Sequence, residues 1–298
     1  MNESDLDGVA SAPLMNTQAR KNPRAISVVE LDQTRAAFDS VAADYDGPRG
    51  NNALIQRMRA TMWRELDRRF AHDARLIDLG CGTGLDALHL AQSGRSVLAT
   101  DWSPGMVGRT VQRAAQAGLA ARIEARRVGA HQLEQIDAAG GFDGAYSNFG
   151  PLNCVPDLGA LSAQCARLLR PGGKLVFSVI GRICPWEYLY YRWRRPERAK
   201  IRALRGPVAV AMNHQTIWTR YFTPREFYAE FARRFDLIEY RALSLFMPPP
   251  YLVRWYERHP RLLELLGLID DAAGGWPVLR NAGDHFLIVM RCKSEPRP

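Results

Sequence analysis

Apolar residues gather in two kinds of stretch along most of this chain. Short apolar runs that suit buried strands lie between segments whose apolar residues recur with helical spacing. These runs occur near 76–79, 95–101, 142–147 and 168–180. Strands that alternate with helices are typical of a mostly parallel sheet covered on both faces. The pattern therefore predicts an α/β fold.

Three further segments extend this pattern. Apolar residues recur every four positions in 51–70, which predicts an amphipathic helix whose methionines belong to the core rather than to a cofactor site. A second helix is expected over 223–234, since Thr223 suits the N-cap and Pro224 the first helical position. The last two strands are expected at 235–245 and 285–291.

A glycine turn follows the first strand and is the most informative feature of the sequence. Gly80, Gly82 and Gly84 stand between the strand and a helix with Leu85, Leu88 and Ala91 on one face. A strand, a glycine turn and a helix in this order bring backbone N–H groups and a helix N-terminus close to a ligand. We expect that a side chain at any of these glycines would hold the ligand off. Cys81, between two of them, is expected to be a small turn residue rather than a nucleophile.

Two classes of cofactor fit such a turn. Gly82, Gly84 and Ala87 satisfy the weaker dinucleotide fingerprint, so an NAD(P)-binding oxidoreductase or a cofactor-binding protein without catalysis stays open. However, Asp78 followed by G-x-G-x-G resembles motif I of the class I S-adenosylmethionine-dependent methyltransferases. S-adenosylmethionine carries an amino group, a carboxylate and a sulfonium but no pyrophosphate, so an acid near the turn suits it better.

Other segments resemble this family in order and spacing. Asp101 ends the second strand, Asn148-Phe149-Gly150 follows the fourth, and a Pro-Gly-Gly turn precedes the fifth. Residues 38–46 resemble the helix that precedes motif I in its small-molecule members, and the resemblance covers about 35–181. It implies a Rossmann-like, seven-stranded, mostly parallel sheet with helices on both faces and an antiparallel final pair of strands. It also implies methyl transfer from S-adenosyl-L-methionine.

The resemblance implies a set of cofactor-binding residues, with one departure from the family pattern. Members commonly carry an acid at the end of the third strand that meets the adenine amino group, and here Ala130 stands in its place. The adenine contact is then expected from a backbone group, His131 or Gln132, although His131 equally suits a surface residue at a helix start. The expected cofactor-binding residues are Asp78, Gly80, Cys81, Gly82, Thr83, Gly84, Asp101, Trp102, Ala130, His131 and Asn148.

Two stretches exceed the minimal fold, Arg182–Phe222 and Met247–Gly283. Ligands of open α/β sheets bind beyond the carboxyl ends of the strands, so the first insertion begins next to the methyl donor. Its five aromatic rings within 186–193 predict a lid with a substrate pocket, lined by Trp186 and Tyr190 together with Asn153. The expected organisation is a flexible extension 1–33, a core 34–181, a lid 182–222, a helix and strand 223–246, a second insertion 247–283, and a final strand and tail 284–298.

Methyl transfer is an in-line displacement on an activated donor, so alignment supplies most of the catalysis. A base is needed only where the acceptor must lose a proton. His214 is the preferred base because it is the only histidine of the first insertion, although a polar lid residue without chemical role fits equally well. Tyr45 is expected to close over the cofactor. The residues considered for catalysis are Tyr45, Asn148, Asn153, His214 and Tyr221.

Composition narrows the class of protein. Five cysteines without a C-x-x-C pair indicate neither a disulfide framework nor a zinc site, and no metal is expected. No apolar run reaches the length of a membrane span, and the polar first thirty residues lack the apolar segment of a signal peptide. We therefore expect a cytoplasmic enzyme of 298 residues built on one large α/β domain.

The net charge of +9 is concentrated in one stretch, where seven basic residues lie between Arg192 and Arg205 against the single acid Glu197. Such a run can follow nucleic acid, attract anionic lipid, steer an acidic substrate, or form a solvated helix face. We expect a small-molecule acceptor first, a lipid-like acceptor with peripheral membrane contact through 186–205 second, and RNA such as tRNA third. Oxygen, nitrogen, carbon and sulfur all remain open as the methylated atom.

Overall fold

A computed structural model describes residues 24–48, 50–137 and 141–293, and seven of its strands form one sheet. The order is β3-β2-β1-β4-β5-β9-β8, and only the pairings of β9 are antiparallel. The mostly parallel sheet and its antiparallel final pair are therefore confirmed. The strands are β1 (Arg75–Leu79), β2 (Ser96–Asp101), β3 (Ile123–Arg127), β4 (Phe142–Ser147), β5 (Leu169–Ile180), β8 (Phe235–Leu243) and β9 (His285–Cys292).

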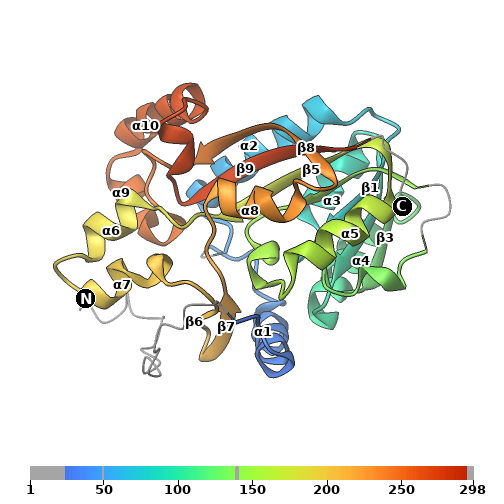
Figure 1. The fold of residues 1–298 in the computed structure, drawn as a ribbon, viewed down its shortest axis with the longest axis horizontal. Helices are drawn as coiled ribbons and strands as arrows, with labels where there is room; N and C mark the ends of the chain where they lie inside the picture. The colour runs from blue at the N-terminus through green and yellow to red at the C-terminus, as the bar shows by residue number, and fades with distance from the viewer. Residues whose placement is uncertain (1–23, 49, 138–140, 294–298) are drawn as a thin grey trace.

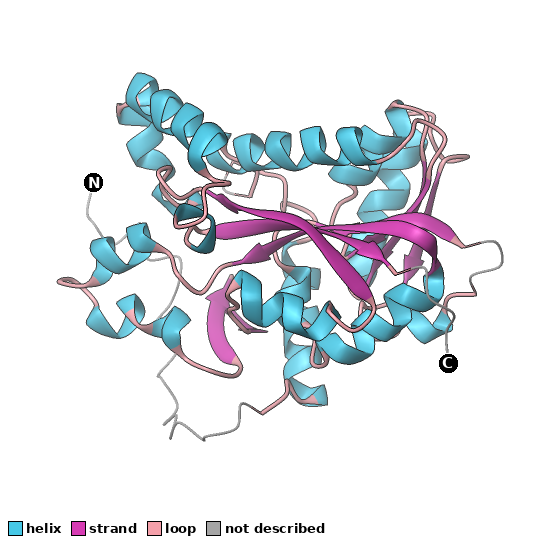
Figure 2. Ribbon diagram, turned by 45° about the horizontal axis from the view of Figure 1, so that its top comes forward, coloured by secondary structure: helices cyan, strands magenta, loops and turns pink. Residues whose placement is uncertain are grey.

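Helices cover both faces of this sheet, as Figure 2 shows. The first strand explains the division, because successive side chains of a strand point to opposite faces. Leu76 packs in the core cluster that contains Met62 and Leu90, whereas Ile77 packs in the cluster that contains Leu161 and Phe227. One face carries α2 (Ala53–Arg69), α3 (Leu85–Gln92) and α4 (Pro104–Gln116), and the other carries α5 (Leu158–Leu168) and α8 (Pro224–Phe231).

Helix starts follow local signals in the sequence. Thr223 and Glu226 form the capping box of α8, as the Thr-Pro-Arg-Glu run predicts. Ser27 and Glu30 form a second capping box, which starts α1 (Val28–Val41). The predicted flexible extension 1–33 therefore ends too late, because α1 already includes Val28; residues 1–23 lie outside the described part of the chain.

The first insertion divides into two parts. Its helical part comprises α6 (Pro185–Tyr191), α7 (Pro196–Ala199) and the turn η4 (Ile201–Ala203). The remainder is a hairpin of β6 (Val208–Met212) and β7 (Gln215–Thr219), which packs against α1 through a hydrogen bond from the Trp218 N–H to Thr34 Oγ1 at 2.9 Å. The insertion is thus tied to the N-terminal helix as well as to the sheet.

The second insertion packs against the helical part of the first. Trp186 of α6 donates its indole N–H to the Phe246 carbonyl at 2.8 Å, and its ring meets the Trp255 ring edge-on at 6.0 Å. Figure 1 shows α6, α9 and α10 gathered at one end of the sheet. The elements of this insertion are η5 (Pro250–Leu252), α9 (Val253–Arg258), α10 (Pro260–Ala273) and η6 (Leu279–Asn281). Within the described ranges, no helix combines the length and apolar character needed to cross a membrane.

Candidate functional site

The three positions after β1 require glycine for different physical reasons. All three adopt positive φ, at 83°, 54° and 82° for Gly80, Gly82 and Gly84. A Cβ on Gly80 would lie 2.3 Å from the Pro151 side chain, and one on Gly84 would lie 2.8 Å from Thr110. A Cβ on Gly82 would meet no atom of the described chain within 4 Å. The expectation that all three keep a ligand path clear is therefore corrected, because only Gly82 borders open space.

Hydrogen bonds tie this turn to the end of β2. The Gly80 and Cys81 N–H groups both donate to the Thr100 carbonyl at 2.8 Å, and the Gly82 N–H donates to Asp101 Oδ2 at 3.0 Å. Burial raises the pKa of Asp101 to about 6, against the opposing donation from the Ser103 and Gly82 backbone. The carboxylate thus sits beside the open glycine with lone pairs left to accept further donors.

Two side chains within the turn, those of Thr83 and Cys81, have different surroundings. Thr83 donates its hydroxyl to Asp46 Oδ2 at 2.7 Å, so its side chain closes the turn against the segment after α1. Burial raises the pKa of the Cys81 thiol well above its usual range, which keeps the sulfur protonated and fits a small turn residue.

Asp78 is a buried carboxylate that lacks a protein partner at one oxygen. It points to the same face of β1 as Leu76, and neither its Oδ2 nor the neighbouring Tyr146 hydroxyl has a hydrogen-bond partner of good geometry among the described residues. Burial, followed by the charge of Asp86, raises the pKa of Asp78 well above its usual range. Buried polar groups are nearly always partnered, so an orphan acceptor beside a ligand turn fits a site for a polar or cationic group.

The segment after β3 lies against the residue that follows Asp101. The rings of Trp102 and His131 meet edge-on with centroids 4.6 Å apart, and burial lowers the pKa of His131. Gln132 accepts the Gly129 N–H at 3.2 Å and so holds the loop before η2 (Leu133–Gln135). Half-buried Ala130 packs against the core cluster on the α5 face. The ring of His131 therefore packs against Trp102 and is not free at the surface. The adenine contact stays a prediction for this segment, beside Trp102.

A cluster of four polar side chains surrounds Asn148 after β4, and the sequence analysis missed the other three members. Asn148 donates to Asp86 Oδ2 at 3.0 Å, while Arg59 and Trp63 donate to Asp86 Oδ1 at 2.8 and 2.7 Å. Arg59 also stacks over the Phe149 ring at 4.8 Å. Asp86 lies in the first turn of the helix after the glycine turn, and an acid there together with an arginine on the apolar face of 51–70 was the available signal.

Asn153 has a structural place that differs from the predicted substrate contact. It lies in η3 (Pro151–Cys154) and is fully buried. Its amide donates to the carbonyls of Ile180 and Arg220 at 3.1 and 2.6 Å, and its oxygen accepts the Ile180 N–H at 2.9 Å. Because backbone groups use both its donor and acceptor sides, Asn153 joins the end of β5 to the first insertion.

The predicted catalytic residues lie in three different environments. Tyr45 packs edge-on against Phe38, and burial raises its pKa to about 12, with the nearby Asp101 and Arg59 also acting on it. Such a phenol keeps its proton and fits the role of closing over a ligand. Burial also raises the pKa of Tyr221, which lies under the Arg202 guanidinium.

His214 lies at the exposed tip of the β6–β7 hairpin. It forms the two-residue turn with Asn213, and both residues have positive φ, at 61° and 46°. Turns of this kind match the twist of a hairpin and favour asparagine-like residues. The turn alone accounts for His214, and the expectation that it serves as a base stays a prediction without geometric support.

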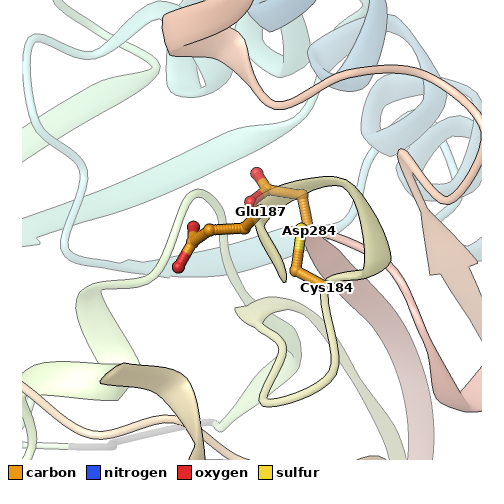
Figure 3. A group of neighbouring side chains, drawn as sticks. All are labelled: Cys184, Glu187 and Asp284. Carbon is orange, nitrogen blue, oxygen red and sulfur yellow. The ribbon is translucent and has the colours of Figure 1, made fainter. Parts of the chain in front are cut away.

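The basic run of the first insertion contains one residue that is buried rather than exposed. Arg202 donates to Glu187 Oε2 at 2.8 Å and to Asp284 Oδ1 at 2.6 Å. Figure 3 shows Glu187, Asp284 and Cys184 together, and their possible metal-ligand atoms lie within 4.8 Å of one another. Because Arg202 already pairs with both carboxylates, this group is an ion-pair cluster that anchors the insertion to the start of β9. Arg202 is therefore not available to any of the surface roles considered for the basic run.

Some of the aromatic rings within 186–193, which were predicted to line a substrate pocket, pack against residues of the two insertions. Trp186 contacts the second insertion as described, and Tyr190 meets Tyr191 edge-on at 4.9 Å while Arg194 stacks on its ring at 5.1 Å. Trp193, in contrast, is 81% exposed. The rings thus divide into a packed group and an exposed end, and their contact with a substrate stays a prediction.

Comparison with known proteins identifies relatives of this chain. A model of a methyltransferase domain matches residues 76–173. A ubiquinone biosynthesis O-methyltransferase of Xanthomonas axonopodis pv. citri (strain 306) is 37% identical over 109 residues, 37% of this chain and 44% of that protein. Another of the same name, from Caulobacter sp. (strain K31), is 31% identical over 179 residues, 56% of this chain and 69% of that protein. The first of these matches thus spans less than half of the relative.

A solved structure resembles the fold over nearly the whole chain. The Burkholderia thailandensis 1,6-didemethyltoxoflavin-N1-methyltransferase, which holds its substrate and S-adenosylhomocysteine, superposes with a TM-score of 0.54 at 20% identity. The match covers 96% of this chain and 100% of that one. At this identity the likeness concerns the fold alone.

Proposed function

Because the chain belongs to the S-adenosylmethionine-dependent methyltransferases, we propose that it transfers a methyl group from S-adenosylmethionine to a small-molecule acceptor. The observation that carries this proposal is the glycine turn, where Gly82 borders open space and donates its N–H to Asp101. The turn, the carboxylate and the orphan oxygen of Asp78 supply groups that suit a ribose and an amino group on one ligand.

Each side of the site has a defined part in this proposal. Asp101 accepts hydroxyl donors of the ribose, Asp78 faces the amino-acid end, and Trp102 with His131 flanks the adenine. Bound S-adenosylmethionine supplies a methyl group activated by a sulfonium. The chain then contributes alignment, which is worth roughly 7–11 kcal/mol of barrier in well-oriented reactions.

The acceptor is proposed to be lipid-like and reached from a membrane surface. Tyr188 and Leu189 are about half exposed, and Trp193 is mostly exposed beside Arg192 and Arg194. Apolar rings with adjacent arginines suit the boundary of an anionic bilayer. The two curated relatives are named for ubiquinone biosynthesis, which supports an acceptor of this character.

A transfer experiment tests the proposal. The purified chain is incubated with methyl-labelled S-adenosylmethionine and either a solvent extract of cellular metabolites or total tRNA. We expect label in the extract and none in tRNA, and Asp101→Asn should reduce the incorporation at limiting S-adenosylmethionine. Label that enters tRNA instead would replace the small-molecule acceptor with the RNA alternative.

Vesicle co-sedimentation tests the membrane contact separately. Vesicles of phosphatidylglycerol should bind the chain in a salt-sensitive manner, vesicles of phosphatidylcholine should not, and Trp193→Ala should weaken the binding. If the same amount of the chain sediments with and without vesicles, the exposed residues at the end of α6 and just after it are solvated. The acceptor would then be reached from solution.

A further inference from the structure

A histidine and an aspartate lie together at the ligand edge of the sheet. β9 runs antiparallel to its neighbours, so its first residue, His285, pairs with Ile180 and Leu243 at the ends of β5 and β8. Ligands of open α/β sheets bind beyond this edge. His285 therefore stands on the functional side of the molecule although it lies more than two hundred residues after the glycine turn.

The segment after β4 joins His285 to the cofactor turn. Pro151 lies directly against Gly80, where a Cβ would approach it to 2.3 Å. Two residues earlier, the Phe149 ring meets the His285 ring edge-on at 6.1 Å. The histidine thus lies across this short segment from the turn.

Asp284 orients the histidine ring. Asp284 Oδ2 lies 3.0 Å from His285 Nδ1, while its other oxygen accepts from Arg202. Burial opposes ionisation of Asp284, but the Arg202 guanidinium and His285 together lower its pKa. An ionised aspartate favours the tautomer with the proton on Nδ1, which leaves the lone pair on Nε2. No described residue forms a hydrogen bond with Nε2.

We propose that His285 is the catalytic base of the methyl transfer and that Asp284 is its positioning residue. This rests on the proposed function. The acceptor is then an acidic hydroxyl such as that of a phenol, enol or hydroquinone. Tyr45 keeps its proton and His214 lies in an exposed turn, so neither offers a comparable oriented base.

The step balances without any further reagent. The acceptor O–H proton passes to His285 Nε2 as the oxygen lone pair forms the new O–CH₃ bond. The S–CH₃ bond breaks, and its electron pair stays on sulfur, which converts the sulfonium into a neutral thioether. The imidazolium later releases its proton to water, which restores the base.

The test uses two acceptors that differ in acidity, catechol and 4-nitrocatechol. In His285→Gln, kcat with catechol should fall ~100-fold or more, as expected for loss of a general base. With 4-nitrocatechol, whose hydroxyl ionises readily without help, the loss should be under about tenfold. Affinity for S-adenosylhomocysteine should stay within about twofold, which shows that the variant is folded.

His259→Gln, at an exposed histidine between α9 and α10, is the matched control and should leave both rates unchanged. Equal losses for the two catechols in His285→Gln, or no loss with either, would overturn the assignment. Efficient transfer to amine or thiol probes with none to catechols would overturn it while leaving the proposed function intact. Cofactor binding without transfer to any probe would count against the proposed function, and the assignment would fall with it.

The wild-type pH profile gives a second readout that needs no variant. The rate with catechol should rise with pH as one base loses its proton. The rate with 4-nitrocatechol should follow this deprotonation much less. The charged or titratable groups around His285 are Asp284, Arg202, Glu187, Cys184 and Tyr251. Identical profiles for the two acceptors would contradict a proton transfer in the transition state.

Discussion

The two sides of this site are built from the sequence in different ways. The centre of the cofactor side consists of residues within one short stretch, from Asp78 to Asp101, joined by hydrogen bonds around a glycine turn. The acceptor side draws His285 from the last strand and Arg202 from an insertion. A contiguous motif can be recognised in a sequence, whereas a site assembled by strand order becomes visible only in the fold.

The largest expected effect breaks the acceptor side alone. Arg202→Met removes the cation shared by Glu187 and Asp284 and leaves two buried carboxylates without it, which should cost about 3–5 kcal/mol of the free energy of unfolding. Urea denaturation would measure the change. Arg194→Met, at an exposed ring contact, is the control and should cost no more than about 1 kcal/mol. Similar losses in both variants would show that the cluster does not anchor the insertion.

The next effect separates the glycines of the cofactor side. Gly82→Ala should cost only about 1–2 kcal/mol of stability, because its positive φ is strained while its surroundings are open. Its affinity for S-adenosylhomocysteine should fall at least tenfold, or about 1.4 kcal/mol. Gly84→Ala adds a collision with Thr110 and should lose more stability. Unchanged affinity in folded Gly82→Ala would place the ligand elsewhere.

A smaller effect concerns the pH dependence of cofactor binding. Burial raises the pKa of Asp101 in the free protein to about 6, and in the proposed complex the ionised carboxylate accepts the ribose hydroxyls. Affinity should therefore be full above pH 6 and fall as the pH drops through 6, by up to about tenfold per unit for one proton. Calorimetry at several pH values would show this. Asp101→Asn should bind more weakly with a flat profile, and a slope that persists in this variant would assign it to another group.

The smallest expected effect is at the hairpin tip. His214→Gly places a residue that tolerates positive φ at a turn position, so stability should change by no more than about 1 kcal/mol and methyl transfer should stay unchanged. Thermal unfolding and turnover with catechol would measure both. A large loss of turnover would restore His214 as the base and remove the need for His285.

Particular residues show which features of the structure could be predicted from the sequence. The cap at Thr223 and the turn at Gly80 to Gly84 follow from local patterns, and the structure has both. The separate reasons for the three glycines depend on Pro151 and Thr110, which reach the turn only through packing. Arg202 appears as one member of a basic run until the fold buries it. His285 belongs to no sequence motif. Only the antiparallel course of β9 brings it to the ligand edge of the sheet.

The central claim is that the turn between β1 and α3 binds S-adenosylmethionine, and calorimetry tests it most directly. Wild-type protein is titrated with S-adenosylhomocysteine, NAD⁺ and NADP⁺, and Asp101→Ala is titrated in parallel. We predict binding of S-adenosylhomocysteine alone, weakened in the variant by roughly 1.5–3 kcal/mol for each charged hydrogen bond lost. Binding of a nicotinamide nucleotide without S-adenosylhomocysteine would contradict the account.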